Sequence, residues 1–128
     1  MNDYSDKTQR ATRHGVRWRV VLVTTDGRQA FGRTGDLSAS GASVYLDVYL
    51  QMQTDALLHL EVPARPDVIE RQIVQLPCRV VYTVHDNAMG QFRTGIQFMQ
   101  LDEPARDILQ RAFKAYFHRA RPVVAEDA

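Results

Sequence analysis

Four arginines stand close together near the start of the chain, at positions 10, 13, 17 and 19. A guanidinium group can donate two parallel hydrogen bonds to phosphate oxygens or to the O6 and N7 edge of guanine. Arginines in a polar segment are also commonly just solvated, and the chain is rich in arginine overall. All but two of its sixteen basic residues are arginine, a bias that genomic base composition can produce. Position must therefore decide whether Arg10, Arg13, Arg17 and Arg19 form a site.

A second group of polar residues follows at Asp36-Leu37-Ser38-Ala39-Ser40-Gly41. The Ser38 hydroxyl can contact a ligand or stabilise a local turn. Gly41 permits either a positive φ or a close approach of another group to the backbone. Taken alone, such a segment is most often an ordinary turn.

Residue types that carry out catalysis or bind metals are not arranged for either task. The four histidines, at positions 14, 59, 85 and 118, have no metal-ligand spacing to one another or to Cys78. No nucleophile-elbow pattern surrounds any serine, and no Gly-Lys-Ser/Thr phosphate loop is present. The sequence therefore predicts no enzyme, no metal site and no cofactor.

Composition predicts one ordinary globular domain. The chain has 128 residues, of which 45% are hydrophobic and 24% charged. No apolar run approaches a membrane span, and the polar start lacks a secretory signal. The single cysteine, Cys78, suits a reducing compartment. We therefore expect a cytoplasmic protein without membrane insertion, and the net charge of +1 makes nucleic acid an unlikely partner.

Alternating apolar residues predict the strands that must position the two polar groups. Trp18, Val20 and Leu22 share one face of a first strand, and Asp26-Gly27 predicts a hairpin turn into a second strand that ends near Phe31. The third predicted strand has the inward residues Ala42, Val44, Leu46 and Val48. The fourth has Leu58, Leu60 and Val62, and Pro63 and Pro66 end it.

Two further strands complete the set. The fifth has an apolar face made by Val74, Leu76, Cys78, Val80, Tyr82 and Val84, and the sixth has one made by Phe92, Thr94, Ile96 and Phe98. Pro77 on the opposite face of the fifth strand predicts a bulge or an edge there. Six strands at regular spacing predict an all-β fold, a closed or nearly closed antiparallel barrel.

The period changes to that of a helix near the C-terminus. Asp102 is a predicted N-cap, and an apolar stripe follows at Ile108, Leu109, Ala112, Phe113, Tyr116 and Phe117. We expect the stripe to cover an end or flank of the barrel, and a docking helix for another protein is the alternative. The predicted organisation is a flexible N-terminal arm over residues 1–16, a barrel and helix over 17–120, and a tail over 121–128.

The chain resembles the PilZ domain family. Its Arg-x-x-x-Arg pair reads Arg13-His14-Gly15-Val16-Arg17, and its Asp-x-Ser-x-x-Gly turn runs from Asp36 to Gly41. The segment Arg93-Thr94-Gly95-Ile96-Gln97-Phe98 also looks like the family's last strand, with the family's helix after it. The resemblance implies a six-stranded PilZ-type barrel that binds the bacterial second messenger cyclic di-GMP (c-di-GMP).

The resemblance also implies the site. The expected ligand-binding residues are Arg10, Arg13, Arg17, Asp36, Ser38 and Gly41. Asp36 would accept hydrogen bonds from the N1–H and N2–H groups of guanine, which selects guanine over adenine. Thr12 stands where many relatives carry another basic residue, which leaves open whether one or two c-di-GMP molecules bind. Trp18 could stack on a base, but its place in the alternation favours the core.

These features together predict a receptor whose arm becomes ordered on binding c-di-GMP and which signals to a protein partner in motility, pilus or exopolysaccharide machinery. One alternative is a PilZ-like adaptor that binds no nucleotide and acts through protein contacts alone. Another is a small barrel that binds single-stranded nucleic acid, which the near-neutral charge disfavours.

Overall fold

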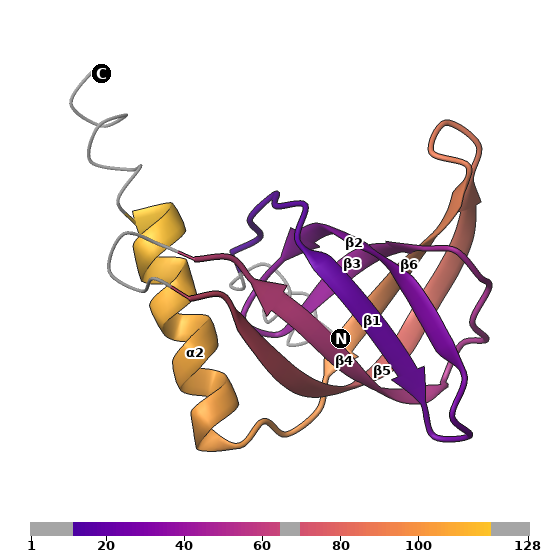
Figure 1. Ribbon diagram of the computed structural model, residues 1–128. Helices are drawn as coiled ribbons and strands as arrows, with labels where there is room; N and C mark the ends of the chain where they lie inside the picture. Colours follow the sequence, from indigo (N-terminus) through magenta and orange to yellow (C-terminus); the bar gives the residue numbers. More distant parts are fainter. Residues whose placement is uncertain (1–11, 65–69, 119–128) are drawn as a thin grey trace, which may run out of the picture.

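The strands form one closed antiparallel barrel (Figure 1). The computed structural model describes residues 12–64 and 70–118. Around the barrel the strand order is β1-β2-β3-β6-β5-β4, and each strand pairs antiparallel with both neighbours. The predicted six-stranded antiparallel barrel is confirmed. The strands are β1 (Arg19–Thr24), β2 (Gln29–Leu37), β3 (Gly41–Leu46), β4 (Asp55–Val62), β5 (Gln72–Asp86) and β6 (Gln91–Phe98).

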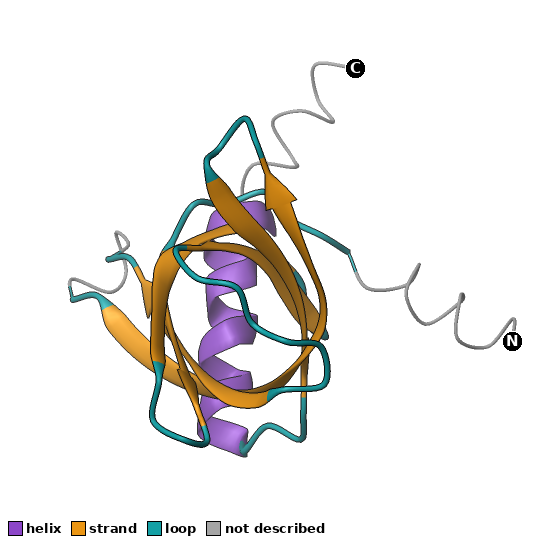
Figure 2. Ribbon diagram, turned by 90° about the vertical axis from the view of Figure 1, so that its right-hand side faces the viewer, coloured by secondary structure: helices purple, strands orange, loops and turns teal. Residues whose placement is uncertain are grey.

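Alternate residues of the strands fill the barrel interior, which Figure 2 shows enclosed by a ring of strands. In β1, for example, Val20 and Leu22 are buried, whereas Arg19, the first residue of the strand, is exposed. Burial of each large aliphatic side chain contributes roughly 1.5–3 kcal/mol. The fully buried aliphatic side chains are Leu22, Leu37, Leu46, Leu50, Leu58, Leu60, Leu76, Val44, Val62 and Val80.

The alternation rule is wrong at the ends of two strands. Val48 is 39% exposed because β3 ends at Leu46. In β5 the pairing with β6 shifts by one residue between Val80 and Tyr82. This bulge turns the following side chains over, so that Val84 is 51% exposed and Tyr82 is only half-buried.

Of the two alternatives predicted at Pro77, a bulge or an edge, the bulge is wrong and a local edge holds, because the β5–β6 ladder does not reach Pro77. Pro77 lies opposite Leu57 of β4, and its carbonyl accepts a hydrogen bond from the Met99 backbone N–H at 2.8 Å. The ladder between β5 and β6 begins only with Cys78, opposite Phe98. Pro77 therefore stands where that ladder starts, and its missing N–H leaves no strand bond unmade.

A helix lies across one end of the barrel (Figure 2), in agreement with the expectation that it covers an end or a flank. Helix α2 (Glu103–Phe113) begins after Asp102, whose carboxylate accepts a hydrogen bond from the Ala105 N–H at 2.9 Å. Leu109 and Ala112 are buried against the strands, and the helix passes into a π-helical turn, η1 (Lys114–His118). Three further residues of the predicted stripe, Ile108, Phe113 and Tyr116, pack partly buried on the core, and the side chain of Phe117 lies outside the described part.

Trp18 belongs to the core rather than to the surface. It is 9% exposed, and its ring meets the Tyr116 ring edge-on with centroids 5.3 Å apart. The Tyr116 hydroxyl donates to the carbonyls of Pro63 and Ala64 at 3.0 and 2.8 Å. Trp18 thus joins the barrel to the C-terminal helix and is not placed to stack on a bound base.

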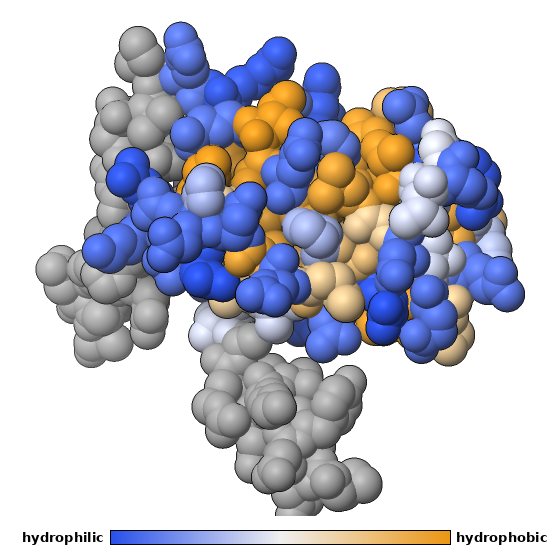
Figure 3. All heavy atoms as spheres, turned by 90° about the horizontal axis from the view of Figure 1, so that it is seen from below, coloured by the Kyte–Doolittle hydropathy of each residue, from blue (hydrophilic) through white to orange (hydrophobic). Residues whose placement is uncertain are grey.

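Apolar side chains also appear on the outer surface, in small groups separated by polar ones (Figure 3). Single exposed apolar residues are normal in proteins of this size, whereas grouped ones can mark binding surfaces. The exposed large hydrophobic residues are Phe31, Val48, Tyr49, Met52, Ile73, Val81, Val84, Met89 and Met99.

Candidate functional site

Residues 12–16, the described part of the predicted arm, lie against the end of β2. Backbone hydrogen bonds join His14 and Leu37 in both directions, at 2.8 and 2.9 Å. The Thr34 hydroxyl also donates to the Val16 carbonyl. These contacts hold the segment beside β2 and bring the first arginine of the motif next to its turn.

Arg13 and Asp36 form an ion pair. The Arg13 guanidinium lies 2.8 Å from Oδ1 of Asp36, and the same oxygen accepts a hydrogen bond from the Ser43 backbone N–H at 3.2 Å. The Asp36 side chain is 23% exposed, and the Arg13 side chain 56%. The structure therefore joins two predicted site residues that are far apart in the sequence, and leaves both open to solvent.

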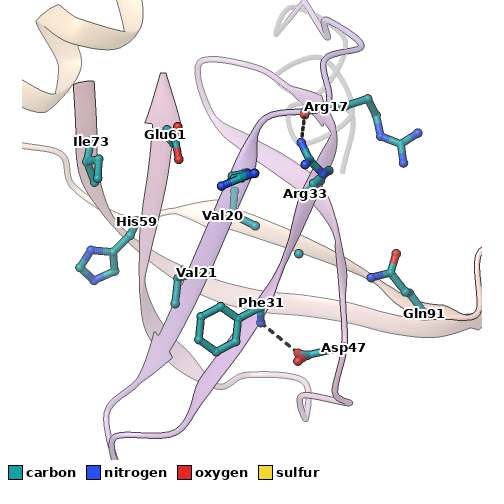
Figure 4. A pocket seen from close by; sticks show the side chains of 12 residues that line it. Arg17, Val20, Val21, Phe31, Arg33, Asp47, His59, Glu61, Ile73 and Gln91 are labelled. Carbon is teal, nitrogen blue, oxygen red and sulfur yellow. Dashed lines mark hydrogen bonds between the residues drawn. The ribbon is translucent and has the colours of Figure 1, made fainter. Parts of the chain in front are cut away.

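Arg17 lies on an aromatic side chain that the sequence analysis did not single out. Its guanidinium carbon is 5.6 Å from the centroid of the Tyr45 ring, a cation–π geometry. A Cβ on Gly35 would lie 2.8 Å from the same ring, so the absence of a side chain there lets Tyr45 lie close to β2. The Arg17 carbonyl accepts a hydrogen bond from Arg33 at 3.2 Å (Figure 4).

Ser38 is committed to the turn between β2 and β3. Its hydroxyl accepts from the backbone N–H groups of Ser40 and Gly41 and donates to the Gly41 carbonyl, each at 3.2 Å. The residue is only 3% exposed. Of the two roles that the sequence left open for Ser38, turn stabilisation is the one the structure describes.

Gly41 is required by a close approach between strands. Its φ is not in the left-handed region, and a Cβ at this position would lie 2.3 Å from the Ile96 carbonyl oxygen. The close-approach alternative therefore holds, and the positive-φ alternative is wrong. The group that approaches is the backbone of β6, because β3 pairs with β6 from Gly41 onward.

The neighbours that complete this surface come from strand pairing. Arg33 and Tyr45 are directly opposite each other on β2 and β3, and Arg19 and Arg33 are opposite on β1 and β2. The one sequence signal for Tyr45 was its outward position in the alternation of β3. Arg10, the remaining predicted site residue, lies outside the described residues, as does the tail over 121–128.

Other chemistry finds no candidate in the described residues. No group of three or more His, Cys, Asp or Glu side chains there could hold a metal ion. Cys78 is buried in the core, and burial raises the pKa of its thiol to about 12, so it stays protonated. None of the described helices has the length and apolar character that a membrane span requires.

The family model for the PilZ domain matches residues 8–115. The chain belongs to the PilZ domain family. PilZ domains are non-catalytic receptor domains, which agrees with the prediction that this chain is not an enzyme. Among curated proteins, no sequence matches it.

Several solved structures share the fold at low sequence identity. YcgR from Escherichia coli in complex with c-di-GMP is 16% identical, with a TM-score of 0.69 over 93% of this chain and 50% of that one. The PilZ domain of the same protein with c-di-GMP is 17% identical, with a TM-score of 0.62 over 91% of this chain and 96% of that one. MotI/DgrA, the inhibitor of motility from Bacillus subtilis, is 13% identical, with a TM-score of 0.67 over 81% of this chain and 49% of that one. This chain spans about half the length of the MotI/DgrA chain and of the YcgR chain in the first complex.

Proposed function

We propose that this PilZ domain is a bacterial receptor for c-di-GMP. The observation that carries the proposal is the Arg13–Asp36 ion pair beside the β2–β3 turn, with the exposed Arg17 four residues after Arg13 and on the Tyr45 ring of β3. Cyclic di-GMP presents two phosphate charges and two guanines. Arg13, Arg17 and Asp36 offer two guanidinium groups and one carboxylate, the complementary set. The structural similarity to YcgR, crystallised with c-di-GMP, supports the same ligand.

Each residue has a distinct role in the proposed complex. Asp36 accepts from the N1–H and N2–H groups of one guanine, and Arg13 and Arg17 bind phosphate oxygens or the guanine O6 and N7 edge. Because Arg13 already pairs with Asp36, ligand binding exchanges a carboxylate for a phosphate on Arg13. Ser38 and Gly41 hold the turn that presents Asp36.

Signalling follows from the segment that carries these arginines. Ligand bound by Arg13 and Arg17 ties the predicted arm, residues 1–16, more firmly to the barrel, and Arg10 adds a further contact. The ordered arm forms part of a surface for a cytoplasmic protein partner. The similarity to an inhibitor of motility supports a partner in motility machinery, with pilus and exopolysaccharide machinery as the other possibilities.

Calorimetric titration of the purified protein with c-di-GMP, GTP and oligo(dT) tests the proposal. We expect binding of c-di-GMP only, weakened about tenfold or more by Asp36→Asn, because the new amide directs a donor at the guanine donors. The matched control is Asp55→Asn, an exposed carboxylate that pairs with Arg79 on the far strands. No binding of any nucleotide would favour the adaptor function instead, and preference for oligo(dT) would favour a nucleic-acid barrel.

A further inference from the structure

A groove of about 570 Å³ runs over the outer face of the barrel beside the candidate nucleotide site. It crosses β1, β2 and β4 and reaches the start of β5 (Figure 4). Arg17 and Arg33 border both the groove and the candidate nucleotide site. The proposed c-di-GMP contacts use none of the apolar residues of the groove.

The middle of the groove is apolar. Phe31 and Val21 are directly opposite each other on β2 and β1, with their side chains on the outside of the barrel. Phe31 is 50% exposed, and Ile73, which also lines the groove, is 60% exposed. Two large exposed apolar residues in one concavity are a typical anchor site for an apolar side chain of a partner.

One end of the groove holds two arginines for which the described part of the chain provides no acidic partner. Arg19 and Arg33 are directly opposite on β1 and β2, an arrangement of like charges that destabilises a strand pair. Within residues 12–64 and 70–118, neither forms an ion pair. The two carboxylates of the groove are otherwise engaged: Glu61 pairs with Arg71 at 3.2 Å, and Asp47 accepts the Phe31 backbone N–H at 2.9 Å.

We propose that this groove binds an acidic segment of a protein partner that carries an aromatic or aliphatic side chain. The apolar side chain lies on Phe31, Val21 and Ile73, and carboxylates flanking it bind Arg19 and Arg33. Glu61 and Asp47 also line the groove and would repel any anion, so the carboxylates of the segment must lie at the end that holds Arg19 and Arg33. A continuous phosphate backbone could not avoid the two acidic side chains, so nucleic acid fits less well. The inference does not depend on nucleotide binding.

Fluorescence anisotropy with designed peptides tests the groove. The probe is a labelled peptide of sequence GSEDEFLEDSG, compared with GSEDEAAEDSG, which lacks the anchor, with GSKRKFLKRSG, which reverses the charge, and with oligo(dT). We expect the first peptide to bind about tenfold or more tightly than the others. In spectra of ¹⁵N-labelled protein, it should shift the amides of β1, β2 and β4 around Val21, Phe31 and His59.

Matched variants assign the contacts. Arg19→Ala and Phe31→Ala should each weaken binding of the peptide about tenfold. Arg28→Ala and Val84→Ala, which change exposed residues outside the groove, should not. Because Arg19→Ala removes a like-charge pair, its melting temperature should equal or exceed that of the wild type, which a merely structural arginine would not show.

Equal binding of all the peptides, or amide shifts elsewhere on the barrel, would overturn the proposal. Tighter binding of oligo(dT) to the same amides would assign the groove to nucleic acid instead. Neither result would affect the c-di-GMP titration, so the two proposals fail separately.

Discussion

Arg13 has an exposed guanidinium 2.8 Å from Asp36, and in the proposed complex it faces a phosphate instead. Replacing Arg13 or Arg17 by Ala should cost roughly 2–4 kcal/mol of c-di-GMP binding, because a charged ligand group loses its partner. That cost corresponds to a loss of about thirtyfold to a thousandfold in affinity. Calorimetry gives the values, with Arg28→Ala on the β1–β2 hairpin as the matched control. Equal affinities of Arg13→Ala and Arg28→Ala would remove Arg13 from the site.

Gly41 gives a prediction about stability. In Gly41→Ala the added Cβ meets the Ile96 carbonyl at 2.3 Å, so β3 or β6 must shift, at a cost of about 1–3 kcal/mol. Gly15→Ala is the control, because its Cβ would have an ordinary contact at 3.9 Å. The melting temperature should fall only in Gly41→Ala. If the folded fraction also loses c-di-GMP affinity, Gly41 borders the ligand as well; if both variants melt alike, the close approach is not a constraint.

Cys78 makes the stability sensitive to alkaline pH. Its pKa is raised from an ordinary 9.0 to about 12 by burial, so above pH 9 the unfolded chain loses this proton while the folded chain keeps it. The protonated thiol therefore contributes fully to the free energy of unfolding below pH 9. This contribution is lost as the pH rises from 9 toward 12, by up to about 1.4 kcal/mol per pH unit. Urea unfolding of the wild type and of Cys78→Val at several pH values isolates it. If the free energies of unfolding of the two proteins change in parallel with pH, the loss of stability does not come from Cys78.

At the scale of single elements, the start of α2 depends on one side chain. Asp102 accepts the Ala105 N–H at 2.9 Å, and Asp102→Ala should lower the free energy of unfolding by about 1 kcal/mol. Asp102→Asn keeps an acceptor at the N-cap and should lose much less. Chemical denaturation of both proteins measures the difference. Equal losses would show that the cap contributes through charge alone.

The strands could be predicted from the sequence because their inner faces alternate, and the β5 bulge could not. Tyr82 and Val84 continue the apolar alternation of the sequence across the bulge, so nothing in the pattern marks the extra residue after Val80. Bulges are set by how two strands meet, and that pairing is not visible in one strand.

The candidate site shows the same limit. The spacing of Arg13, Arg17 and Asp36 could be read as a motif, but Tyr45 and Arg33 reach the site through cross-strand register. Sequence order places them far from Arg17, and only pairing brings them near. The Arg19 and Arg33 pair of the groove was missed for the same reason.

For the whole molecule, the proposed attachment of the arm can be followed by proteolysis. Trypsin cleaving after Arg13 must detach this segment from β2, where His14 bonds to Leu37 and Arg13 to Asp36. Saturating c-di-GMP adds contacts to the same segment, so cleavage after Arg10 and Arg13 should slow several-fold. Cleavage after Arg28 serves as the internal reference. Unchanged rates at Arg10 and Arg13 would show that the arm does not close on the ligand.

Closure of the barrel limits how fast its strands can form or rearrange. Val20 of β1 lies opposite Leu60 of β4, and Gly41 of β3 opposite Gln97 of β6, so the ring closes only when distant parts of the chain meet. Such topologies fold in roughly milliseconds to seconds, and amide hydrogens in doubly paired strands exchange mainly through global opening. A signal that comes and goes faster than this cannot be carried by rearranged strands. It has to pass through residues outside the ladder. The segment around His14, which the His14–Leu37 bridge and the Arg13–Asp36 ion pair hold to β2, carries the arginines of the motif.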